Sequence, residues 1–302
     1  SSGRSRATGV ASVAAAVLLA AISSPVAATE PGRIGTGGDD PAIVVAQSAE
    51  DLAVTRWKLD QAERLRVAVG RGARAEGAGQ GARPQPALVP PVCTYDCAPV
   101  TFALASWARQ QINWYYCGPA SAQVIINQTR EIASASTGGQ STTANYRTQS
   151  AIGSFMGTND QTGTSSGQLR NGLNQFADLD DTGRHIAFTI LDGIASGSDF
   201  HWAMVTATWL LQRGAAVPVQ MTYSSQHLAS WASSSWWSRN PSAVVRHWIS
   251  VHGYSGFWDG SYTPTLAYTD SAGGYGGQTG NFVSSSRLVY NLNQANSGRI
   301  VY

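Results

Sequence analysis

The sequence is poor in charge, and above all in lysine. Only 13% of its 302 residues are charged, the net charge is +2, and Lys58 is the single lysine. A chain with so little net charge lacks the basic surface that binds nucleic acid, so we predict no nucleic-acid partner. Solubility must instead come from Ser, Thr, Asn, Gln and Gly, a composition that favours an extracellular protein.

The main hydrophobic run near the start of the sequence is too short to cross a bilayer. It covers residues 10–22, follows Arg4 and Arg6, and leads to small residues at 26–28, whereas a spanning helix needs ~20 apolar residues. A basic start, a short apolar run and a small-residue cleavage site predict a secretory signal peptide over residues 1–28. The alternative is a membrane anchor that is never cut. We therefore expect a secreted protein with no membrane association after signal cleavage.

Cysteine is scarce as well, with Cys93, Cys97 and Cys117 as the three representatives. In an oxidising compartment an odd count suggests one disulfide and one free thiol, and we predict a Cys93–Cys97 bridge that leaves Cys117 free. Two thiols without a neighbouring histidine are too few ligands for zinc, and no acidic cluster favours calcium. We therefore predict no metal site and no cofactor.

Residues 29–92 have the composition of a linker that contains one helix. Gly, Ala, Arg and Pro prevail at both ends, whereas Ser48 and Asp51 resemble a capping box that begins an amphipathic helix over residues 48–69. This arrangement predicts either a pro-segment lying across the active-site cleft or a flexible linker with an ordinary helical tail. The folded domain is expected over residues 93–302.

Within that domain the expected elements change from helices to strands. The capping, glycine and periodicity patterns predict helices at residues 120–127, 151–156, 164–177 and 198–210, and strands at residues 185–191, 217–223, 244–254 and 262–269. The final segment, residues 282–302, is expected to close the sheet. Helices that precede antiparallel strands indicate an α+β fold, with the N-terminal helices packed on an antiparallel sheet.

The most informative stretch runs from Gln111 to Ala122. An aromatic approach ends at Cys117, and Gly-Pro then begins a helix, because proline is favoured in the first helical turn. The unpaired N–H groups and the dipole of a helix N-terminus favour the thiolate, which is the nucleophilic form of cysteine. Gln111 offers an amide N–H for a developing oxyanion. The alternative for Cys117 is a small buried hydrophobic residue.

A nucleophilic cysteine needs a base, and the base needs an orienting group. His247 and His252 share one predicted strand and point to opposite faces, because their separation is odd. His247 lies with Ile249 and Val251 on the more apolar face, which we expect to pack on the cysteine helix, so we choose it as the base. Asp270 ends the next strand and would fix the imidazole tautomer. The alternatives are a core histidine and a turn-forming aspartate.

Three motifs together resemble one family: Gln111 with Cys117-Gly-Pro-Ala-Ser, His247-Trp-Ile-Ser-Val-His-Gly-Tyr, and Tyr268-Thr-Asp270. They are similar to the pattern of C39-like peptidases, papain-fold cysteine peptidases that include the double-glycine peptidases of bacteriocin processing. The resemblance covers residues 93–302 and implies a papain-like fold that acts on a peptide or protein substrate. It implies Cys117 as nucleophile, His247 as base, Asp270 as orienting acid and Gln111 as oxyanion donor. We expect the protein to act as a monomer.

Two other functions remain open from the sequence. A cell-wall amidase or an acyl transferase would use the same cysteine and histidine on another substrate. A non-catalytic module could bind peptide or glycan through an aromatic surface formed by Trp231, Trp236 and Trp237.

Overall fold

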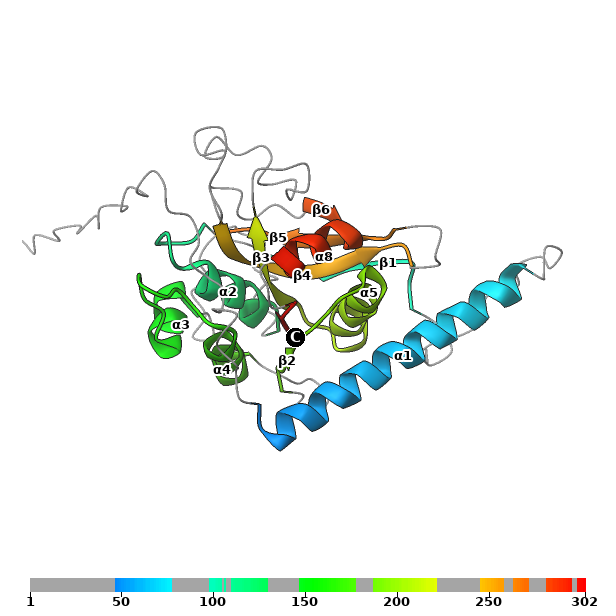
Figure 1. Cartoon of the computed structure of the whole chain (residues 1–302), viewed down its shortest axis with the longest axis horizontal. Coiled ribbons are helices and arrows are strands. Elements are labelled where there is room, and N and C mark those ends of the chain that lie inside the picture. The colour runs from blue at the N-terminus through cyan, green and yellow to red at the C-terminus, as the bar shows by residue number, and fades with distance from the viewer. Residues whose placement is uncertain are drawn as a thin grey trace, which may run out of the picture.

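The structure is a computed structural model. It describes residues 47–77, 98–104, 106, 110–129, 147–177, 187–221, 245–257, 263–271, 281–294 and 298–302. The predicted signal peptide, the predicted Cys93–Cys97 disulfide and the tryptophans of the predicted aromatic surface lie outside these residues. Helices flank a central sheet, and one long helix runs along the lower side of the molecule (Figure 1).

The described strands form one seven-stranded sheet in which every pairing is antiparallel. They are β1 (Thr101–Ala103), β2 (Ile190–Leu191), β3 (Ala215–Met221), β4 (Val245–Ser255), β5 (Thr265–Thr269), β6 (Asn281–Ser284) and β7 (Ile300–Val301). Their order is β2-β7-β3-β4-β5-β6, and β1 also pairs with β4. The sheet and the helices that precede it confirm the α+β class.

Three helices pack together beside one face of the sheet. They are α2 (Cys117–Thr129), α3 (Gln149–Met156) and α4 (Ser166–Phe176), and their apolar residues share a cluster with Trp248 of β4. Local signals define their ends: Thr148 caps α3, and Ser165 with Gln168 forms a capping box on α4. Fully burying an aromatic side chain such as Trp248 contributes about 2–3 kcal/mol, so this cluster fixes α2 against β4.

The other face of the sheet carries α5 (Gly197–Val205), which continues as the π-helix η3 (Thr206–Leu210), and α8 (Ser285–Gln294). The sequence prediction missed α8, because residues 282–302 were expected to close the sheet and only β6 and β7 do so. Leu288 and Leu292 are four residues apart and both are buried, which is the spacing of a helix face. The helical spacing of these two leucines was not recognised from the sequence.

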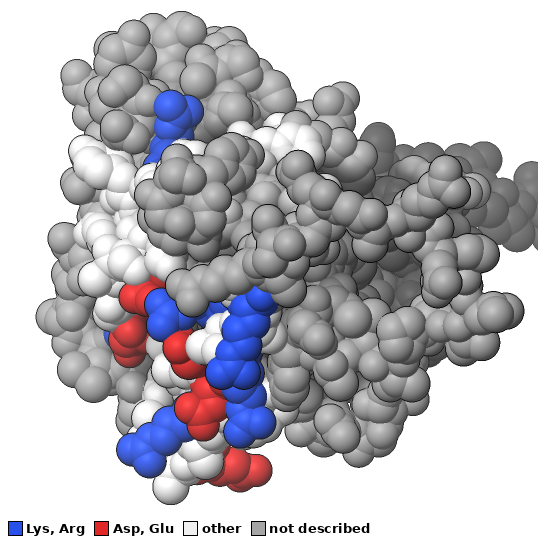
Figure 2. Space-filling view, turned by 90° about the vertical axis from the view of Figure 1, so that its right-hand side faces the viewer, with Lys and Arg blue, Asp and Glu red and all other residues white. Residues whose placement is uncertain are grey.

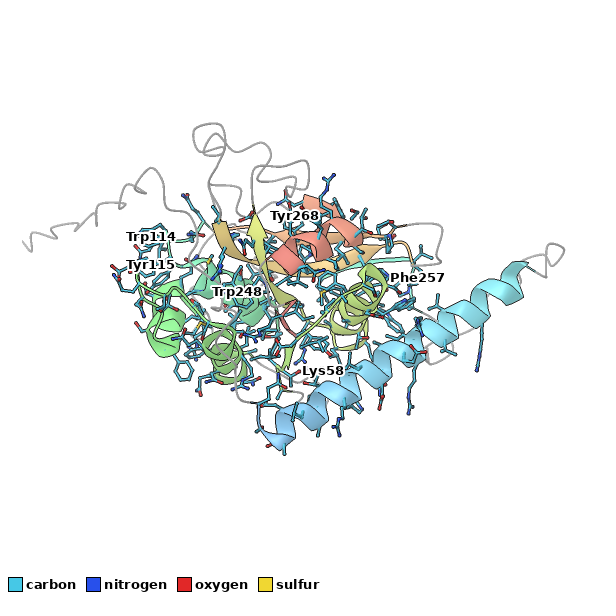
Figure 3. The ribbon with its side chains drawn as sticks, in the orientation of Figure 1. Lys58, Trp114, Tyr115, Trp248, Phe257 and Tyr268 are labelled. Carbon is cyan, nitrogen blue, oxygen red and sulfur yellow. The ribbon has the colours of Figure 1, made fainter. Side chains whose placement is uncertain are left out.

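The predicted amphipathic helix is α1 (Ala49–Gly77), which is longer than expected because it continues through Gly70. It packs mainly against α5, η3 and β2. Its Lys58 is fully buried, and the ammonium donates to the backbone oxygens of Ala187 and Tyr302 and to the Thr189 hydroxyl. Lys58 thus points from α1 into the body of the molecule (Figure 3), so α1 is anchored there rather than loosely attached. That α1 belongs to a pro-segment stays a prediction.

The described surface matches the low net charge of the sequence. On the face shown in Figure 2, acidic and basic side chains are interspersed over the part that the structure describes, without a patch of one sign. Among the described helices, none is both long enough and apolar enough to cross a membrane.

Candidate active site

Cys117 occupies the first position of α2, as the Gly-Pro pattern predicts. Tyr116 accepts a hydrogen bond from the Ala120 N–H at 2.9 Å and so begins the helix. The Cys117 thiol is free of any disulfide and fully buried. Because the first N–H groups of a helix have no partner within the helix, the sulfur lies where negative charge is favoured.

Gly118 allows the start of α2 to approach the segment that precedes α4. A Cβ atom on Gly118 would lie 2.5 Å from both Cβ and Oγ1 of Thr164. The backbone oxygen of the same Thr164 accepts a hydrogen bond from the Trp248 indole at 2.9 Å. Thr164 therefore links the neighbour of Cys117 on α2 to the neighbour of His247 on β4, a role that no local pattern around Thr164 indicates.

His247 and Asp270 form a buried pair on neighbouring strands. His247 Nε2 lies 2.7 Å from Asp270 Oδ1, and both side chains are almost completely removed from solvent. Cys117 lies near enough to the imidazole to contribute to the raised pKa of His247. The imidazole is therefore paired with the carboxylate and has the Cys117 thiol among its neighbours, so the structure brings together three of the four residues predicted for catalysis.

The electrostatics of this group favour a charged imidazole. Burial alone lowers the pKa of His247, but the charge and hydrogen bond of Asp270, followed by those of Cys117, outweigh it and raise the pKa to about 10. At neutral pH the folded protein thus holds an imidazolium between a carboxylate and a thiol.

The prediction that the face of β4 with Ile249 and Val251 packs on the cysteine helix was wrong. Ile249 and Val251, expected to pack on the cysteine helix, belong instead to the cluster with α5 and α8. Trp248, from the opposite face of β4, packs with the apolar residues of α2. The alternation of side chains along a strand could not show which helices cover each face.

The other histidines of the described part of the chain have different surroundings. His252 is buried within β4, where its Nδ1 lies 3.1 Å from the Leu104 backbone oxygen. His201 is fully buried in α5, where its ring packs edge-on against Trp202 and Tyr254. Burial lowers the pKa of His201 to about 4, so this ring is neutral at physiological pH.

Gln111 is close to the acid end of the site, but its amide is already engaged. Nε2 donates to the backbone oxygens of Asn113 at 2.9 Å and Trp114 at 2.8 Å, and Oε1 accepts from the Ser271 hydroxyl at 3.2 Å. Trp114 lies with Tyr115 at the end of the molecule occupied by α2 and α3, away from α1 (Figure 3). The oxyanion role of Gln111 stays a prediction.

Within the described residues, no group of three His, Cys, Asp or Glu side chains is placed to hold a metal ion. Comparison with models of protein families, with curated proteins and with solved structures finds no match to this chain.

Proposed function

We propose that this protein is a secreted cysteine peptidase with a papain-like fold. The observation that supports the proposal is the arrangement of Cys117, His247 and Asp270. A free thiol begins a helix, and the imidazole whose pKa it influences is paired at 2.7 Å with a buried carboxylate. A helix-borne cysteine beside an antiparallel sheet that supplies histidine and acid from adjacent strands is also what a papain-like fold predicts.

The reaction proposed is acyl transfer to the sulfur. The Cys117 thiolate attacks a peptide carbonyl carbon, and the π electrons move to the oxygen, where the Cys117 N–H at the helix terminus stabilises the oxyanion. The intermediate collapses to a thioester as the departing amine takes a proton from the His247 imidazolium. Neutral His247 then removes a proton from water, which attacks the thioester and releases the acid and the thiolate. Asp270 holds the ring in position and stabilises its charge.

The substrate is proposed to be a peptide or protein met outside the cell, with the enzyme acting as a monomer. The same three groups would also serve a cell-wall amidase, because the chemistry at the sulfur is identical. A peptide library and purified peptidoglycan should therefore be digested side by side. Release of wall fragments without cleavage of any peptide would favour the amidase.

The test of catalysis combines mass mapping with variants. An epoxide inhibitor of thiol peptidases should add once to the native protein, and the modified residue should map to Cys117. Cys117→Ala should abolish both labelling and hydrolysis. The matched control is Gln128→Met on the same helix, whose amide bonds to the Gly214 N–H and the Gln212 oxygen, and it should keep the rate. Hydrolysis that survives in Cys117→Ala would refute the proposal.

A further inference from the structure

We propose that Gln111 is a positioning residue, which clamps the turn after Asp270 to the segment that precedes Cys117, rather than the donor that stabilises the oxyanion. The inference deepens the proposed function and rests on it for its catalytic consequence. Its structural part depends only on hydrogen bonds among buried or partly buried groups of the described chain.

Both hydrogens of the Gln111 amide are used within its own turn. Nε2 carries two hydrogens, and it lies within hydrogen-bond distance of two backbone oxygens, those of Asn113 and Trp114. Exchanging the amide oxygen and nitrogen would place Oε1 against these two carbonyl oxygens, so repulsion fixes the assignment. Donation to an oxyanion would thus leave one of these carbonyl oxygens without this donor.

The rest of Gln111 reaches across to the acid. Its backbone N–H donates to the Ser271 oxygen at 3.0 Å, and its Oε1 accepts from the Ser271 hydroxyl at 3.2 Å. Ser271 directly follows Asp270, and Gln111, Ser271 and Asp270 are all buried. Gln111 therefore ties the residue beside the acid to the turn that leads into Cys117.

A second glutamine holds the neighbours of Gln111 from the opposite side. Gln149, buried at the start of α3, accepts from the Ile112 N–H at 3.0 Å and donates to the Gln110 oxygen at 3.1 Å. Its Nε2 also lies 3.2 Å from Gln123 Oε1 on α2. Residues 110–112 are thus held between α3, which packs on the nucleophile-bearing α2, and the turn after β5, which carries the acid.

This bridge has a direct bearing on the geometry of the proposed reaction. Cys117 belongs to the helical side of the site, whereas His247 and Asp270 belong to the sheet. The segment 110–112 is hydrogen-bonded to both sides, so it helps to set the distance between sulfur and imidazole. A displacement of about 1 Å between reacting groups costs about 10²-fold in rate.

The experiment separates positioning from oxyanion stabilisation by using a reaction that forms no oxyanion. Alkylation of Cys117 by iodoacetamide is a displacement at carbon, and its rate follows the thiolate fraction. The readout is the midpoint of the rate against pH, because limited access to the buried sulfur scales all the rates alike. Gln111→Met, Ser271→Ala, the double variant and the control Gln128→Met are compared, together with kcat/KM for peptide hydrolysis.

The positioning role predicts that Gln111→Met and Ser271→Ala both shift the alkylation midpoint and both lower kcat/KM, by up to about 10²-fold for Gln111→Met. Because the two residues act through one contact, the double variant should be little worse than Gln111→Met. The control should match the wild type in both measurements.

Three results would overturn the proposal. A 10²–10³-fold loss of kcat/KM in Gln111→Met with an unchanged alkylation profile would identify an oxyanion donor. Losses that multiply in the double variant would show two independent roles. An unchanged alkylation midpoint in Ser271→Ala would show that the contact between Gln111 and Ser271 does not position the acid. This variant also keeps the test available if Gln111→Met does not fold. Absence of any hydrolysis by the wild type would count against the proposed function, while the alkylation profiles would still test the clamp.

Discussion

Replacing Asp270 by asparagine should abolish a pH dependence of stability that originates in the buried histidine. The pKa of His247 is raised from 6.5 to about 10, against the effect of burial, chiefly by the charge and hydrogen bond of Asp270. At 1.36 kcal/mol per pKa unit, this rise corresponds to about 5 kcal/mol in favour of the charged ring. The value agrees in size with the ~3–5 kcal/mol lost when one partner of a buried ion pair is removed.

The direction of the effect follows from proton binding. Because the pKa of His247 is higher in the folded than in the unfolded chain, the folded state holds an extra proton between pH 6.5 and about 10. The stabilisation is complete below pH 6.5 and is lost as the pH rises through 10. Asp270→Asn should therefore cost about 3–5 kcal/mol at pH 6, and only about 1 kcal/mol, the worth of a neutral hydrogen bond, near pH 10.

The assay is urea unfolding at fixed pH values between 6 and 10, analysed by linear extrapolation. Both proteins should carry Cys117→Ala, so that ionisation of the thiol does not contribute. Lys58 and Arg213, whose pKa values burial lowers, titrate in both proteins and cancel in the difference. If Asp270→Asn costs the same at pH 6 and near pH 10, the folded protein holds a neutral imidazole and the reasoning fails.

Two further predictions concern other parts of the molecule. Gly118→Ala should destabilise the protein by about 1–3 kcal/mol and slow alkylation of Cys117, because the new Cβ would meet Thr164 at 2.5 Å. A Cβ on Gly70 meets nothing within 4 Å, so Gly70→Ala should instead stabilise α1 by about 0.5–1 kcal/mol. Equal effects of the two substitutions in thermal unfolding would contradict this prediction. Burial lowers the pKa of His201 to about 4, so between pH 6.5 and 4 the unfolded chain binds a proton here that the folded chain does not. The free energy of unfolding should therefore fall by up to about 3 kcal/mol over this pH range. In His201→Phe this acid dependence, followed by urea unfolding, should largely disappear.

Local patterns were sufficient to predict the parts of the site that depend on local chemistry. Gly-Pro after Cys117 placed the thiol at a helix terminus, and the structure begins α2 at that residue. The strand that ends before Asp270 was predicted as the partner that returns beside the histidine strand, and its pairing with β4 brings the acid to His247. These relations involve one helix start and one pair of adjacent strands, which sequence reasoning handles well.

The remaining features depend on contacts between segments far apart in the sequence. Nothing near Gln149 indicates that its amide holds residues 110 and 112, and nothing near Thr164 indicates that it meets both Gly118 and Trp248. The face of β4 that packs on α2 was misjudged for the same reason, because helices cover both faces of the sheet. With both faces buried, the more apolar side of a strand no longer identifies which helix covers it.

The burial of Lys58 turns the only lysine of the chain into a reporter. Its ε-amine is enclosed by α1, the β2 region and Tyr302, so an acylating reagent added to the folded protein should leave it unmodified. The amine becomes reactive only when α1 separates from the body. The rate at which an acyl group appears at this position, mapped by mass spectrometry, therefore measures the opening of one helix in a chain that has no other lysine.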